Sequence, residues 1–136
     1  MTDLFANQHA MYDAQYEAIG ALFDPGDEVE VDFASLAQKL REALSDPALP
    51  RYYRAEYHII NAWCVREPEL QLERARESLD DMVQVLQAEG QSQEQIDAHL
   101  LTLREMLAIS EKRTKAKAER YVSLSSCGEP CMLIIV

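Results

Sequence analysis

Three histidines, His9, His58 and His99, are the side chains of this 136-residue chain best suited to proton transfer or metal binding. They fall on three different predicted helices, and no His-Glu-x-x-His pattern places two metal ligands on one helical face. The acidic run from Asp24 to Asp32 also lacks the order of oxygen ligands and glycine that forms a calcium loop. We therefore expect scattered structural or surface histidines, no metal site and no cofactor.

Arg51 and His58 are seven residues apart, which is two helical turns, so their side chains can share one face of a predicted helix. This R-x6-H spacing resembles the signature of HEPN-type helical ribonucleases. The resemblance implies that Arg51 stabilises and His58 protonates a phosphodiester during RNA cleavage, which is acid–base chemistry near neutral pH. Tyr52 stands where that family usually has a polar residue, and the chain is acidic. We therefore expect a surface arginine, a packed histidine and no catalytic residue.

The C-terminal residues join nucleophilic side chains to an apolar end, in the sequence SCGEPCMLIIV at positions 126–136. Cys127 and Cys131 supply only two local thiols, so a metal or redox role needs Cys64 or a histidine as well. Three cysteines are an odd and sparse set, which favours reduced thiols over a disulfide framework. Gly128 and Pro130 oppose helix, and we expect residues 121–136 to form an extended tail.

Three further interpretations of this tail stay open. Its β-prone residues 132–136 can pair with the sequence EVEV at 28–31, or pack back onto the helices. A free tail can instead add a strand to a partner's sheet, with Ile134 and Val136 in alternate pockets. The layout also resembles that of precursors of ribosomally made, modified peptides. That resemblance implies a helical leader at 1–120 and a core at 121–136 whose serines and cysteines supply ring-forming groups.

The rest of the chain is dominated by apolar residues at helical spacing. Asp32 suits a helix N-cap, and Ser92 with Gln95 forms a capping-box pattern. The predicted helices cover residues 4–23, 33–44, 50–65, 68–90 and 92–119, with the third as the most buried, and residues 28–31 are predicted to be extended. Since each apolar stripe must be covered, we expect an all-α, single-domain bundle or α-hairpin array of four to five helices, with residues 1–120 as the helical domain.

Charge and composition restrict the function. The chain has 24 acidic and 13 basic residues and a formal net charge of -11, which opposes general binding to nucleic acid. Neither a secretory signal nor an apolar run of about 20 residues is present, so we expect a cytoplasmic protein with no membrane partner. We predict a non-catalytic protein-interaction module that binds another protein, with a homo-oligomer left open. The predicted partner-binding residues are Asp27, Glu28 and Glu30 in the acidic loop, and Ile134 and Val136 in the tail.

Overall fold

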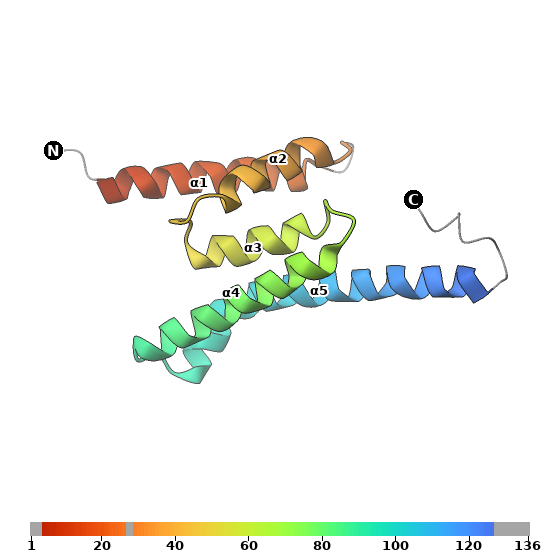
Figure 1. The fold of residues 1–136 in the computed structure, drawn as a ribbon. Coiled ribbons are helices and arrows are strands. Elements are labelled where there is room, and N and C mark those ends of the chain that lie inside the picture. Colours follow the sequence, from red (N-terminus) through yellow and green to blue (C-terminus); the bar gives the residue numbers. More distant parts are fainter. Residues whose placement is uncertain (1–3, 27–28, 127–136) are drawn as a thin grey trace.

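Five α-helices make up the part of the chain that the computed structural model describes, residues 4–26 and 29–126 (Figure 1). They are α1 (Leu4–Phe23), α2 (Phe33–Leu44), α3 (Arg51–Asn61), α4 (Pro68–Ala88) and α5 (Gln93–Ser126). No strand occurs within these described ranges, so the predicted all-α fold is confirmed. The last ten residues of the predicted tail lie outside the described residues.

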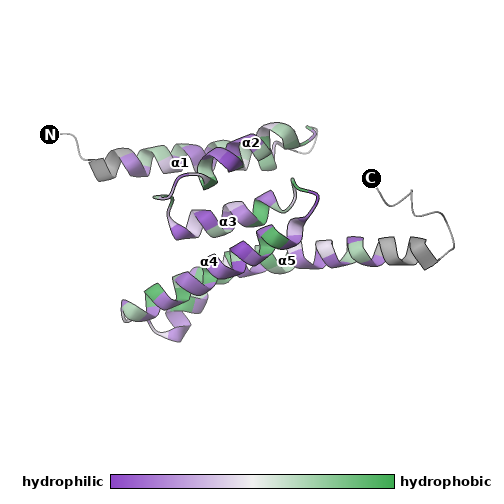
Figure 2. Cartoon of the chain, in the orientation of Figure 1, coloured by the Kyte–Doolittle hydropathy of each residue, from purple (hydrophilic) through white to green (hydrophobic). Residues whose placement is uncertain are grey.

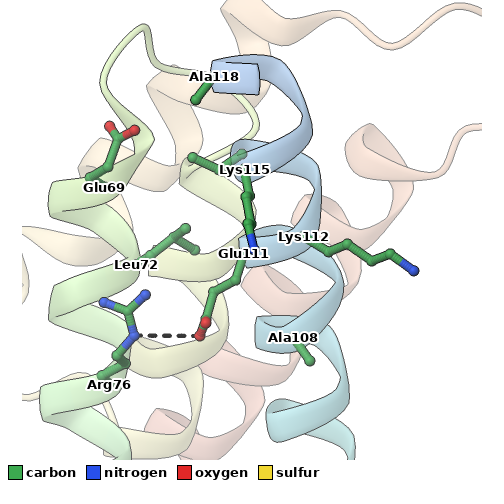
Figure 3. A pocket seen from close by; sticks show the side chains of 9 residues that line it. Glu69, Leu72, Arg76, Ala108, Glu111, Lys112, Lys115 and Ala118 are labelled. Carbon is green, nitrogen blue, oxygen red and sulfur yellow. Dashed lines mark hydrogen bonds and ion pairs between the residues drawn. The ribbon is translucent and has the colours of Figure 1, made fainter. Parts of the chain in front are cut away.

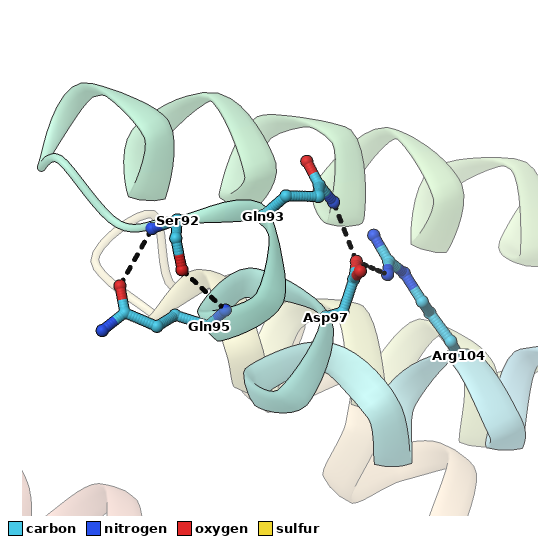
Figure 4. Close-up of polar contacts among 5 residues, drawn as sticks. All are labelled: Ser92, Gln93, Gln95, Asp97 and Arg104. Carbon is cyan, nitrogen blue, oxygen red and sulfur yellow. Dashed lines mark hydrogen bonds and ion pairs between the residues drawn. The ribbon is translucent and has the colours of Figure 1, made fainter.

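The ends of the helices follow from local chemistry. Asp32 caps α2, because its Oδ1 accepts a hydrogen bond from the Ser35 backbone N–H at 3.1 Å. The predicted capping box opens α5: the Gln95 N–H donates to Ser92 Oγ, and the Ser92 N–H donates to Gln95 Oε1 (Figure 4). Gly90 ends the α4 segment with a φ of +86°, a conformation that a side chain would strain.

Three predicted boundaries differ from the structure. Residues 29–31 form an irregular connection and not a strand, because no described segment pairs with them. The third helix ends at Asn61 rather than near residue 65. After Asn61 the chain forms a tighter turn, in which the N–H groups of Trp63 and Cys64 donate hydrogen bonds to the carbonyl oxygens of Ile60 and Asn61. The fifth helix continues to Ser126, beyond the expected end at residue 119. Its lysines and alanines favour a helical conformation, and residues 93–127 contain no glycine or proline that would end the helix.

Helix α3 lies between two pairs of helices, with α1 and α2 on one side and α4 and α5 on the other (Figure 1). Its two faces therefore belong to two hydrophobic cores. One core joins α3 to α4 and α5, and includes Ala55, Ile59, Leu72, Leu79, Ile96, Leu100 and Leu103. The other joins α3 to α1 and α2, and includes Tyr12, Ile19, Leu36, Leu40, Tyr57 and Ile60. The expectation that the third helix is the most buried one is correct, since every residue from Ala55 to Ala62 is buried.

Candidate functional site

The predicted partner-binding residues are only partly visible. Glu30 is exposed in the connection between α1 and α2. Asp27, Glu28, Ile134 and Val136 lie outside the described residues. The acidic-loop and tail interpretations therefore remain predictions.

Arg51 and His58, the predicted pair for RNA chemistry, lie on the side of α3 that faces α4, but in different surroundings. Arg51 is exposed at the start of α3, whereas the side chain of His58 is 7% exposed. His58 Nδ1 donates a hydrogen bond to Gln71 Oε1 of α4 at 2.8 Å, and burial lowers the pKa of His58 below its ordinary value. A neutral, hydrogen-bonded histidine links two helices here, so its geometry matches the packing role expected from the sequence.

Arg54 occupies the space between these two residues and is committed to backbone contacts. Its guanidinium donates hydrogen bonds to the carbonyl oxygens of Leu44 and Asp46, where α2 ends. The last carbonyls of a helix have no intrahelical donor, so Arg54 supplies that donor and fixes the connection from α2 to α3. Two polar clefts lie here, and both are lined by Arg54, Ser78 and Asp81. The hydrogen bonds of Arg54 and His58 within them hold α2, α3 and α4 together.

A buried carboxyl group, Glu56, lies where α3 meets α1. Tyr16 of α1 donates a hydrogen bond to Glu56 Oε1 at 3.3 Å, while Glu56 Oε2 is buried without a hydrogen-bond partner. Burial raises the pKa of Glu56 above its ordinary value. Tyr53 extends this aromatic contact, with its ring centre 5.3 Å from that of Tyr16 and 6.0 Å from that of Tyr57. Glu56 itself is only 7% exposed, so a ligand would reach its carboxyl group only after α1 moved.

Trp63, the single tryptophan, joins α5 to the rest of the molecule. Its indole N–H donates to Ser110 Oγ of α5 at 3.0 Å, and the guanidinium of Arg113 lies 3.9 Å from the centre of its ring. Phe23, the last residue of α1, contacts the same ring edge-on, with ring centres 5.7 Å apart. Trp63 thus connects α1 to α5. The guanidinium of Arg113 is already engaged with the Trp63 ring.

Beyond Trp63, α5 continues past the rest of the bundle (Figure 1). The ion pair between Arg76 of α4 and Glu111 of α5, at 3.4 Å, sets these antiparallel helices in register. From that level α4 reaches its first residue, Pro68, after eight residues, whereas α5 continues for fifteen to Ser126. At a rise of 1.5 Å per residue, α5 projects about 10 Å beyond the start of α4. This end of α5 has no neighbouring helix in the described part of the chain.

A groove of about 600 Å³ runs between the first turns of α4 and residues 108–118 of α5, just before the projecting end (Figure 3). Leu72 of α4, a core residue that is 2% exposed, lies at its bottom, and the exposed small residues Ala108 and Ala118 of α5 form its apolar wall. Its rim is charged, with Glu69, Arg76, Glu111, Lys112 and Lys115 around the opening. An apolar wall inside a charged rim is the arrangement found in interfaces that bind protein side chains.

Charge is distributed unevenly between this segment and the remainder. Residues 112–120 hold five of the 13 basic residues and one acidic residue. The rest of the chain keeps eight basic and 23 acidic residues, a formal net charge of -15. Lys112, Lys115 and Lys117 are exposed, and Figure 2 shows mostly hydrophilic colours along this part of α5. Residues 112–119, which lie beside the start of α4, thus form a basic surface on an acidic protein.

This groove could not be predicted from the sequence. The cluster of cations was visible in the sequence, but it equally indicates a solvated helix end that complements the helix dipole. The contribution of α4 could not be predicted, because Glu69, Leu72 and Arg76 come to line one groove with residues 108–118 only when the two helices pack against each other. The only sequence feature that indicated this groove is the alternation of small residues and cations at 112–120, which follows the apolar stripe of residues 96–107.

Two further results concern metal ions and membranes. Within residues 4–26 and 29–126, no cluster of three or more histidine, cysteine, aspartate or glutamate side chains is arranged to hold a metal ion. The same residues include no helix with the length and apolarity needed to cross a bilayer.

Comparison of the chain with models of known protein families, with curated proteins and with solved structures found no match.

Proposed function

We propose that this protein is a non-catalytic interaction module that binds another protein in the cytoplasm. The observation that carries the proposal is the groove between α4 and α5, continued by the projecting end of α5. The exposed residues Ala108 and Ala118 offer apolar surface there, and the surrounding charges provide orientation. The acidic loop that contains Glu30 is retained as a second part of the proposed interface, where it would face basic groups of the partner.

A helix without neighbours also supports this proposal. Isolated helices of fewer than about 12 residues are marginal in water, because most helical stability in proteins comes from packing. Among the described side chains, none from residues 113–119 belongs to either hydrophobic core, so docking of a partner would stabilise this part of α5. The proposed mechanism is burial of apolar surface along this segment, with charge setting the orientation and rate of association.

Filling the groove tests this function. We expect Ala108→Trp to reduce the recovery of bound partner at least tenfold, because the indole would occupy the space over Leu72. Ala98→Trp is the matched control, since Ala98 is an exposed alanine near the other end of α5. Both full-length variants are purified from the native cell, and co-purified proteins are quantified by mass spectrometry beside the unchanged chain. Equal recovery with both variants, in folded protein, would refute the proposed interface.

The intact mass of the same purified chain addresses the peptide-precursor alternative. A mass change confined to residues 121–136, or release of that segment from an intact helical body, would favour a leader and core. An unmodified chain that retains its partner would favour the interaction module. Loss of RNA cleavage on His58→Ala is the corresponding test of the ribonuclease alternative.

A further inference from the structure

The groove and projecting end of α5 restrict the kind of partner, provided that the proposed interaction function holds. We propose that this surface receives an amphipathic α-helix of another protein, with small apolar residues on one face and acidic residues beside that face. The shape of the groove, the short side chains that line it and the unequal distribution of charge all favour such a partner.

The shape of the groove fits a helix. The groove lies between two neighbouring helices, and a third helix packs onto such a pair at an interaxial distance of about 8–10 Å. From Ala108 to Ala118, α5 lines the groove over about 15 Å, which matches about ten residues of a helical partner. Ala108 and Ala118 have short side chains, so the backbone of an incoming helix can approach closely. Anchors at i, i+3, i+4 and i+7 would then contact the apolar wall.

The charges favour acidic residues on that partner helix. Lys112, Lys115 and Lys117 are exposed along the segment, whereas Arg76 and Glu111 of the rim are already paired with each other. Lys112 and Lys115 line the groove, whereas Lys117 lies on the opposite side of α5. Acidic side chains beside the apolar face would therefore meet the ammonium groups of Lys112 and Lys115. The strongly acidic remainder of the chain repels a partner whose acidic surface extends beyond this segment, which favours a local acidic helix.

Other occupants match the surface less well. Nucleic acid would bring an extended line of phosphates towards a chain whose remainder has a formal net charge of -15, and it has no apolar face for Ala108 and Ala118. A second copy that paired its groove with this one would place the lysines of both chains against each other. Both occupants give distinct outcomes in the experiment below.

Site-specific photo-crosslinking tests the nature of the partner. The full-length chain carries benzoylphenylalanine in place of Ala118 in the groove or, as a matched control, in place of exposed Gln38 on α2. We expect crosslinks from position 118, and not from position 38, to an acid-rich, helix-forming segment of another protein. Lys112→Glu combined with Lys115→Glu should lower the crosslink yield at least tenfold, while Lys39→Glu with Arg41→Glu on α2 should leave it unchanged.

The outcomes separate this inference from the proposed function. Crosslinks from position 118 to a neutral or basic segment, insensitive to reversal of the two lysines, would overturn the acidic helix and leave an interaction module. Crosslinks to the chain itself would identify a second copy, and crosslinks to nucleic acid would identify that class, each overturning the inference. Crosslinking only from position 38, or from neither position, would remove this groove as the interface and with it both proposals.

Discussion

Replacing Ile59 or Ile60 with alanine is expected to lower the free energy of unfolding by about 2–4 kcal/mol, although these neighbouring residues face different cores. Ile59 is 1% exposed between α3, α4 and α5, and Ile60 is 4% exposed between α1, α2 and α3. Each truncation removes three buried carbon groups and leaves a space that close-packed neighbours only partly fill. Ile109→Ala, at an isoleucine that is 61% exposed, should change stability by less than about 0.5 kcal/mol.

The shape of the unfolding curve is the more informative measurement. Because α3 supplies side chains to both cores, we expect each variant to unfold in one transition, observed together by circular dichroism and by Trp63 fluorescence. Trp63 is a suitable probe, since Phe23 of α1 and Ser110 of α5 both contact it. If Ile60→Ala instead gave an early phase in which α1 and α2 separated, while the other core remained folded, the shared role of α3 would be wrong.

The helix starts could be predicted from the sequence because they depend on neighbouring residues. Asp32 reaches a backbone N–H three residues away, and Ser92 and Gln95 satisfy each other's N–H groups within one turn. No distant partner takes part in these hydrogen bonds. Local rules therefore located α2 and α5 before the fold was known.

Features that depend on distant residues could not be predicted in the same way. The alternation of valine and glutamate at 28–31 has the period of a strand, but a strand also needs a second strand to pair with. Val29 and Glu30 are exposed, and no described segment pairs with them. The contact between Tyr16 and Glu56 joins residues 40 positions apart, so its buried carboxyl group looked like any surface acid of a helix. The same holds for the groove, where the packing of α4 against α5 decides which residues line it.

Replacing Glu56 with glutamine is expected to change the pH dependence of stability more than any other carboxyl substitution in the described residues. Burial raises the pKa of Glu56 in the folded chain above the ordinary value of 4.5, so the folded chain holds this proton more tightly than the unfolded chain does. The stability that Glu56 contributes is therefore fully present below about pH 4.5 and is lost as the pH rises through the higher folded value. Glu56→Gln removes this loss.

At pH 8 the Glu56→Gln variant should consequently be more stable than the unchanged chain by about 1 kcal/mol, because the amide carries no charge for burial to disfavour. Below pH 4 the difference should disappear, because Glu56 is then neutral in both states. The measurement is urea denaturation from pH 4 to pH 8, and Glu105→Gln, at an exposed position of α5, is the control. Taking the difference between variant and unchanged chain cancels the opposite trend of His58, whose lowered pKa makes the fold lose stability as the pH falls. A pH-independent difference would mean that α1 opens far enough for water to reach Glu56, so that Tyr16 does not seal the carboxyl group.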